Sequence, residues 1–184
     1  GRYSMDFEDL EKECANHDLK AAILCNPHNP VGRVWSREEL QRFGDICLKH
    51  DVLVISDEIH GDLIFKGHNF TPFATLGPEF SDRSITCTAA SKTFNLAGLQ
   101  TSNMVIPNDD LRETFQEMCD RSGVFTLNMF GILSLEAAYN HGEEWLDQLM
   151  VYIADNFRCL ESFFKAHLPE FPVIKTEGTY LVWI

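Results

Sequence analysis

Val52-Leu53-Val54-Ile55-Ser56-Asp57 is the stretch that decides the fold. It opens with an unbroken apolar run, which is typical of a short strand buried on both faces of a parallel sheet. Asp57 follows the apolar run closely, so we expect it at the carboxyl end of that strand. Ligands of open α/β sheets bind outside the carboxyl ends of the strands, which makes Asp57 a candidate site residue.

The segments on either side of this stretch alternate between helix and strand patterns. Ser36 and Glu39 form a capping box, which is the signature of a helix N-terminus. Short apolar strands are predicted at residues 21–25, 84–88 and 101–106. Strands that alternate with helices are typical of a parallel sheet, so the predicted fold class is α/β.

The remaining stretches are predicted to be mostly helical. Asp6 can cap a first helix that ends near Asn16. Residues 111–119 and 130–137 gather apolar side chains on one helical face, and the longest helix is predicted at 143–167. The apolar stripe of that helix, which we interpret as core packing, consists of Leu146, Leu149, Met150, Ile153, Phe157, Leu160 and Phe164.

The predicted domain boundary follows the longest helix. Pro169 and Pro172 break the helical pattern, and a strand pair is expected to begin around Val173 and Tyr180. The predicted parts are residues 1–142 of one domain, a connecting helix at 143–168, and the start of a smaller domain at 169–184. The chain begins without an initiator Met and ends on an apolar stretch typical of the middle of a strand. An unpaired apolar strand is a sticky edge, so we expect a fragment of a longer protein.

Composition and charge argue against several functional classes. The 184 residues carry a formal net charge of −13, whereas nucleic-acid and anionic-membrane partners require a basic face. No apolar run approaches the roughly 20 residues that span a bilayer. The cysteines form no C-x-x-C pair and have no histidine at ligand spacing, so we expect reduced thiols in a cytoplasmic protein and no metal site. They are Cys14, Cys25, Cys47, Cys87, Cys119 and Cys159.

Polar residues with useful chemistry follow three of the predicted strands. Asn29 follows the first, Asp57 the second and Lys92 the third. Each has an ordinary structural explanation, since Asn29 could shape a turn, Asp57 could cap the next segment and Lys92 could lie in solvent. Strand ends that share one edge of a sheet can nevertheless bring all three side chains into one pocket.

Three segments together resemble a known family. Asn26-Pro-His-Asn-Pro-Val-Gly32, Ser56-Asp-Glu-Ile-His60 and Ala90-Ser-Lys-Thr-Phe-Asn95 are similar, in order and spacing, to the signature segments of fold-type I pyridoxal-phosphate (PLP) enzymes. These are the class I/II aminotransferases and their relatives. The resemblance implies the large domain of a PLP-dependent transferase, with a mainly parallel sheet flanked by helices. It also implies PLP as the cofactor and the start of a small C-terminal domain.

The resemblance assigns roles to individual side chains. Lys92 would carry PLP as a Schiff base and then act as the general base at the substrate Cα. Asp57 would pair with the protonated pyridine nitrogen, because an anion there favours the charged ring. Asn29 would donate to the phenolic oxygen of the ring. His60 stands where aminotransferases carry a Tyr for the same oxygen, although it could instead be a turn residue packed on Asp57.

Two departures from the aminotransferase pattern concern the phosphate. Gln100 stands where a phosphate-binding Arg or Lys is usual, and Ala89 stands where Ser is usual. Ser91, with Thr88 as a second candidate, would then supply neutral donors to the phosphate. The segments D-E-I-H and S-K-T-F-N-L-A-G-L-Q resemble the cystathionine β-lyase-like subgroup of C–S lyases.

The resemblance leads to three functional hypotheses. The first is a PLP-dependent C–S β-lyase that acts on cystathionine or cysteine S-conjugates and releases a thiol, pyruvate and ammonia. The second is an aminotransferase that moves an amino group between an amino acid and a 2-oxo acid. The third is a fragment that is non-catalytic on its own, while the intact protein would be a homodimer.

Family members are longer than this chain, and part of their site is expected outside it. The residues that stack on PLP and embrace its phosphate would precede Gly1, and the arginine that binds the substrate carboxylate would follow Ile184. The arginines present here are interpreted as surface residues. They are Arg2, Arg33, Arg37, Arg42, Arg83, Arg112, Arg121 and Arg158.

Overall fold

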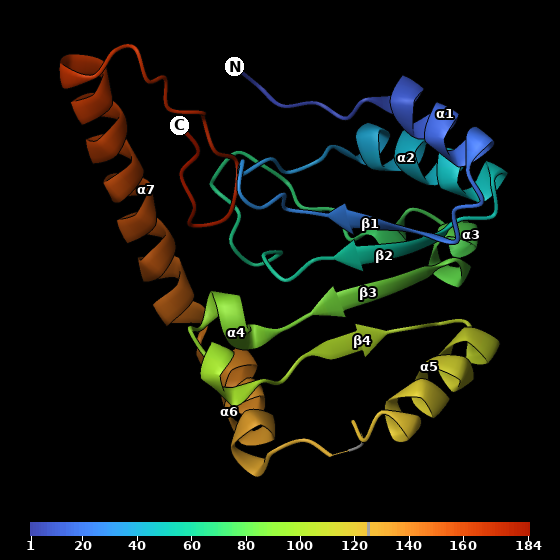
Figure 1. The fold of residues 1–184 in the computed structure, drawn as a ribbon. Coiled ribbons are helices and arrows are strands. Elements are labelled where there is room, and N and C mark those ends of the chain that lie inside the picture. The colour runs from blue at the N-terminus through green and yellow to red at the C-terminus, as the bar shows by residue number, and fades with distance from the viewer. Residues whose placement is uncertain (125) are drawn as a thin grey trace.

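The structure is a computed structural model that describes residues 1–124 and 126–184. A four-stranded sheet forms its centre, with helices on its sides and ends (Figure 1). The strands are β1 (Ala21–Cys25), β2 (Leu53–Asp57), β3 (Ser84–Thr88) and β4 (Asn103–Val105). The helices are α1 (Phe7–Asn16), α2 (Arg37–Lys49), α3 (Pro78–Asp82), α4 (Ala90–Thr93), α5 (Asp109–Arg121), α6 (Met129–His141) and α7 (Glu143–His167), with short 3-10 turns η1 (Phe73–Thr75) and η2 (Ala97–Leu99).

The sheet has the strand order β1-β2-β3-β4, so neighbours in the chain are neighbours in space. The first three strands are parallel, and β4 is antiparallel to β3. The predicted α/β class with a mainly parallel sheet is therefore confirmed, while the strand expected at residues 101–106 is shorter than predicted. Because β1, β2 and β3 run in the same direction, their carboxyl ends share one edge of the sheet (Figure 1).

The core lies between one face of the sheet and helices α1 and α2. Alternate residues of β2 point to this face, so Val54 is buried whereas Leu53 and Ile55 are only partly buried. On the opposite face of β1, Ile23 is 76% exposed. The prediction that residues 52–55 are buried on both faces thus holds for one face only. The core residues are Cys14, Leu24, Trp35, Leu40, Phe43, Ile46, Cys47, Val52, Val54, Phe73, Leu76 and Phe80.

The helix boundaries follow the predicted caps. The Asp6 side chain accepts a hydrogen bond from the Asp9 N–H, and α1 ends at Asn16 as expected. Ser36 and Glu39 form the predicted capping box at the start of α2. Helix α7 has the predicted bounds, and its apolar stripe is half-buried; Phe157 packs against Phe65 with ring centroids 5.2 Å apart.

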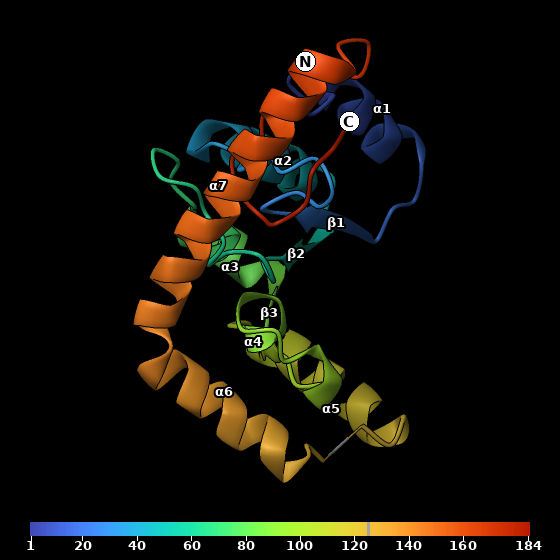
Figure 2. The same cartoon turned by 90° about the vertical axis from the view of Figure 1, so that its left-hand side faces the viewer.

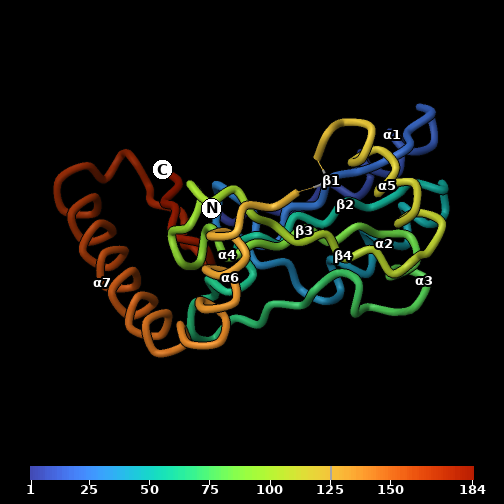
Figure 3. Tube along the Cα trace, turned by 90° about the horizontal axis from the view of Figure 1, so that it is seen from below, coloured from blue at the N-terminus to red at the C-terminus, as the bar shows by residue number. Residues whose placement is uncertain are grey.

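Helices α6 and α7 lie at the edge of the sheet where β1, β2 and β3 end (Figure 2). Seen from below, α7 occupies one end of the molecule while α1 and α5 occupy the other (Figure 3). No helix among the described residues is both long enough and apolar enough to span a bilayer.

The chain after α7 differs from the prediction. No regular strands form at Val173 and Tyr180, although the Ile174 N–H donates to the Trp183 carbonyl at 2.9 Å and so joins the two segments. Residues 176–180 between them pass beside the loops that follow β1 and β2. Gly178 forms an isolated antiparallel bridge with Ile64. The backbone N–H groups of Glu177, Gly178 and Thr179 donate to these loops, so the two segments do not extend their pairing into regular strands.

Candidate functional site

The three strand ends bring the predicted residues to one edge of the sheet. Asn29 lies in the loop after β1, Asp57 is the last residue of β2, and Lys92 lies in α4 directly after β3. Cys25, Asp57 and Cys87 are register partners on adjacent strands and form a row across the sheet. Neighbouring strands are about 4.8 Å apart, so Asp57 has a thiol on each side.

Asp57 is the acidic residue of this edge that faces the two thiols. Its Oδ1 accepts a hydrogen bond from the Ile59 N–H at 3.2 Å. Burial raises the pKa of Cys25 and of Cys87, and the negative charge of Asp57 raises both further. These pKa effects agree with the strand register, which sets Asp57 between the two thiols.

The adjacent Glu58 has a structural role instead. It is buried and accepts hydrogen bonds from the Ser56 hydroxyl at 2.9 Å and from the Phe73 N–H at 2.8 Å. Burial raises the pKa of Glu58, an effect that these two hydrogen bonds oppose. Glu58 therefore anchors the turn η1, which leaves Asp57 as the carboxylate available at the strand end.

His60 is buried beside the charged residues, with 2% of its surface exposed. Burial lowers its pKa; the charge of Asp57 opposes this effect and the charge of Lys92 adds to it. Both charged side chains therefore act on the His60 ring. The ring packs edge-on against Tyr180, with centroids 5.7 Å apart. Within the described residues, its buried Nδ1 has no hydrogen-bond partner, which marks it as a group able to bind a ligand atom.

Lys92 is held in the short helix α4 by its neighbour Thr93. The Thr93 side chain is fully buried and its hydroxyl donates to the Asp62 carboxylate at 2.8 Å. The Tyr139 hydroxyl, from α6, donates to the same carboxylate oxygen at 3.5 Å. Lys92 is half-buried and forms no ion pair with any residue that the structure describes. Its amine is therefore available at the site.

The predicted phosphate donors, Ser91 and Thr88, both precede Lys92 in the chain. Ser91 lines a small cavity between α4 and α6, together with Gly131 and Ser134. The Thr88 hydroxyl accepts a hydrogen bond from the Asn103 side chain at 3.4 Å, which ties β3 to β4. Of these two hydroxyls, that of Ser91 is thus the less engaged in hydrogen bonds with the described residues.

Asn29 belongs to a loop that Asn26 fixes. The peptide bonds Asn26–Pro27 and Asn29–Pro30 are both cis. Asn26 is fully buried; its side chain accepts from the Trp35 N–H at 3.2 Å and donates to the Thr71 carbonyl at 3.2 Å. Asn29 is exposed, and its N–H donates to the Cys25 sulfur at 3.4 Å. The segment at residues 26–32 therefore contains one buried asparagine that fixes the loop, Asn26, and one exposed asparagine, Asn29.

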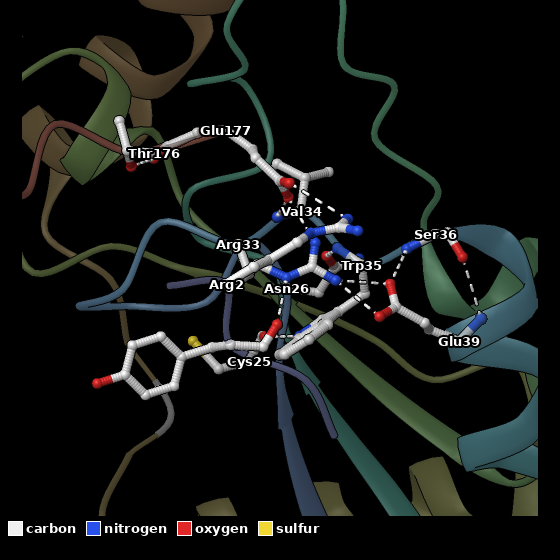
Figure 4. A network of polar contacts seen from close by, with 12 residues as sticks. Arg2, Cys25, Asn26, Arg33, Val34, Trp35, Ser36, Glu39, Thr176 and Glu177 are labelled. Carbon is white, nitrogen blue, oxygen red and sulfur yellow. Dashed lines mark hydrogen bonds and ion pairs between the residues drawn. The ribbon is translucent and has the colours of Figure 1, made fainter. Parts of the chain in front are cut away.

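Arg33 corrects the interpretation of the arginines as surface residues, because only 2% of it is exposed. Its guanidinium donates to both oxygens of Glu39 at 2.7 and 2.8 Å and to Glu177 at 2.7 Å (Figure 4). Its Nε donates to the Tyr3 carbonyl at 2.8 Å. The sequence contained no local signal for this burial, because Glu177 lies 144 residues away in the chain.

The chemistry of the site fits PLP. A lysine amine suits its aldehyde, a carboxylate suits its pyridine nitrogen, and an unpartnered imidazole nitrogen suits one of its oxygens. Lys92, Asp57 and His60 supply these groups at one edge of the sheet. No cluster of histidine, cysteine or acidic residues able to hold a metal ion occurs in the described part of the chain.

Comparisons with known proteins agree on one family. The family model for aminotransferase class I and II matches residues 1–184. The chain is 48% identical to cystathionine beta-lyase PatB from Bacillus subtilis (strain 168), over all of the chain and 48% of that protein. The chain therefore spans about half the length of the curated relatives it matches.

Solved structures give the same picture. Cystalysin from Treponema denticola, which contains a pyridoxal 5'-phosphate cofactor, superposes with a TM-score of 0.96 at 42% identity, over 99% of this chain and 46% of that one. A PLP-bound C–S lyase from Staphylococcus hominis superposes with a TM-score of 0.93 at 41% identity, over 99% and 45% of the two chains.

Proposed function

Because the chain belongs to the class I and II aminotransferase family, we propose that the full-length protein is a PLP-dependent carbon–sulfur β-lyase. Its substrates would be cystathionine or cysteine S-conjugates, and its products a thiol, pyruvate and ammonia. The observation that carries the proposal is the gathering of Lys92, Asp57 and His60 at one strand edge. The relatives named as cystathionine beta-lyase and C–S lyase support the choice of reaction.

The residues of this chain would divide the work of holding the cofactor. Bound PLP supplies an electron sink for negative charge at the substrate Cα. Lys92 would hold the cofactor through its amine and, once released, would remove the Cα proton. Asp57 would keep the ring nitrogen protonated, because its charge favours the protonated form. His60 and Asn29 would hold the ring oxygen, and Ser91 would donate to the phosphate.

The alternative reaction is amino-group transfer, which the name of the family model favours. Both reactions begin with removal of the Cα proton, so Lys92 is required for either. They differ in their products and in the need for a 2-oxo acid. We expect the full-length protein to release pyruvate from cystathionine with no 2-oxo acid added. Amino transfer that depends on a 2-oxo acid, without pyruvate release, would establish the aminotransferase instead.

The test of cofactor attachment is an absorbance spectrum of the full-length protein with added PLP. We expect a visible band that survives dialysis, is absent from Lys92→Ala and persists in Lys66→Ala. Lys66 is a matched control because it is an exposed lysine on the loop after β2. A band that is retained in Lys92→Ala would overturn the assignment of Lys92.

The remaining assignments complete the proposal for the whole protein. We place residues 1–142 in the cofactor-binding domain, 143–168 in the connecting helix and 169–184 at the start of a small domain. The full-length protein would be a cytoplasmic homodimer that acts on a small amino-acid substrate. The substrate-carboxylate arginine would come from outside these residues, so the 184-residue chain alone would be inactive.

A further inference from the structure

Residues 176–180, here called the strap, join the loops that carry Asn29 and His60. The Glu177 and Gly178 N–H groups donate to the Gly32 carbonyl at 2.7 and 3.1 Å. On the other side, the Thr179 N–H donates to the Leu63 carbonyl at 2.7 Å, and the Phe65 N–H donates to the Glu177 carbonyl at 3.0 Å. The strap therefore bonds through its backbone to the loop after β1 and to the loop after β2.

The Arg33–Glu177 ion pair fixes the strap to the loop after β1 (Figure 4). Both residues are buried, and Glu177 also accepts a hydrogen bond from the Val34 N–H at 2.9 Å. Burial alone would raise the pKa of Glu177, but the hydrogen bonds from Val34 and Arg33 and the charge of Arg33 outweigh it and lower the pKa. Glu177 is therefore held in its charged form, which is the form that pairs with Arg33.

The strap continues directly to the His60 ring. Thr179, which is fully buried with a φ of 70°, turns the backbone just before Tyr180. Tyr180 then packs edge-on against His60, at an interplanar angle of 75°. The charged groups that act on His60 from the other elements are Asp57 at the end of β2 and Lys92 in α4. Tyr180 thus adds an aromatic contact to the ring on which these two charges act.

We propose that Tyr180 and the Arg33–Glu177 ion pair are positioning residues for His60. The strap holds Tyr180 against the imidazole, and this contact would fix the ring whose Nδ1, unpartnered among the described residues, the proposed function assigns to the ring oxygen of the cofactor. The inference rests on the proposed function, since the role of His60 is defined by that cofactor. Neither Tyr180 nor Arg33 needs to touch the cofactor to affect its binding.

The first test is hydrogen exchange, measured by mass spectrometry on the full-length protein without added PLP. Glu177→Gln removes the charge and nearly preserves the shape. We expect exchange at residues 176–180 and 60–65 to accelerate by about tenfold or more, while β3 exchanges as in the wild type. Faster exchange in the strap with unchanged exchange at 60–65 would overturn the proposal. If β3 also exchanges faster, the variant has unfolded and the next test decides.

The second test is the dissociation constant for PLP, measured by titration of the full-length protein. Tyr180 is 40% exposed, so its truncation is compatible with a folded protein. We expect Tyr180→Ala to weaken binding roughly three- to tenfold, and Tyr180→Phe, which keeps the ring against His60, to bind within about twofold of the wild type. Equal affinities for the wild type and Tyr180→Ala would overturn the proposal.

The two tests separate this inference from the proposed function. A wild-type protein that binds no PLP would overturn the proposed function, yet exchange at residues 60–65 would still report on the strap. A protein that binds PLP through Lys92, with an affinity that does not depend on Tyr180, would retain the function and lose the inference.

Discussion

His60 is a buried imidazole whose pKa lies below its ordinary value, mainly because of burial. The unfolded chain therefore binds a proton near pH 6.5 while the folded protein does not. The contribution of His60 to the free energy of unfolding is fully present above about pH 6.5. It decreases as the pH falls from there through the lowered pKa. Thermal unfolding between about pH 5 and 8 should show this decrease. Burial also lowers the pKa of His28, so part of the slope should remain in any single variant.

His60→Gln is the variant that isolates the His60 contribution. It removes the titrating group, so we expect a shallower loss of melting temperature in acid than in the wild type. Identical slopes for the two proteins would show that the buried imidazole does not titrate differently on unfolding.

Thr93 should affect both stability and cofactor attachment. Thr93→Val removes the hydroxyl that donates to Asp62 and leaves a side chain of nearly the same shape. A hydrogen bond to a charged group contributes roughly 1.5–3 kcal/mol, so we expect a loss of that order in the free energy of unfolding. PLP should also bind more weakly, because α4 carries Lys92. Thr114→Val on the exposed side of α5 is the control and should change stability by about 0.5 kcal/mol or less.

At the scale of single residues, the sequence could predict the site residues that lie at or just after the end of a strand. Asp57, His60 and Lys92 lie together because parallel strands share their carboxyl edge. Arg33 and Tyr180 could not be assigned, because their contacts join segments far apart in the chain. A loop arginine has the same local sequence pattern whether it pairs with a distant glutamate or lies in solvent.

Gly32 is the residue that allows the loop after β1 to approach the strap. Its φ is +70°, and a Cβ added there would lie 1.6 Å from the Thr176 hydroxyl oxygen. Left-handed backbone costs other residues roughly 1–2 kcal/mol, and the overlap adds to that cost. We therefore expect Gly32→Ala to lower the free energy of unfolding, measured with urea, by more than about 2 kcal/mol.

Gly67 provides the matched control for this substitution. Its φ is +96°, but a Cβ added there meets nothing within 4 Å. Gly67→Ala should therefore show the backbone cost without the overlap. Equal losses for the two variants would mean that the loop adjusts to a side chain at position 32.

The elements that were predicted well are those whose signals are local. The caps at Asp6 and Ser36 depend on neighbouring residues, and the bounds of α7 follow from its own periodicity. The short helix α4 and the course of the strap were not predicted. Apolar residues near Val173 suggested a strand, but the hydrogen bonds of Glu177 and Thr179 are made to loops from the first half of the chain.

The molecule as a whole combines an exposed apolar surface with a strong negative charge. Apolar side chains on α6 are more than half exposed at Met129, Phe130 and Leu133, whereas the formal net charge is −13. Apolar patches favour association, and like charges oppose it until salt screens them. We expect the 184-residue chain to associate more strongly at about 1 M than at about 0.01 M ionic strength, measured by light scattering.

Phe130→Ser should weaken that association, because the residue is 73% exposed and contributes to the apolar surface. Thr114→Ser on α5 is the control and should leave it unchanged. Association that is insensitive to both salt and Phe130 would show that the α6 surface is not the cause.

The fold class and the family could be inferred from the sequence at the scale of the whole molecule. The open face of the sheet could not, because a continuous apolar strand suggests burial on both faces.

The separation of Arg33 and Glu177 in the chain has a consequence for biosynthesis. A ribosome that adds about 5–20 residues per second takes roughly 7 to 30 s to add the 144 residues between them. During that interval the loop after β1 has emerged without its distant carboxylate. The loop that carries Asn29 is therefore completed late, and chaperones have access to it throughout that interval.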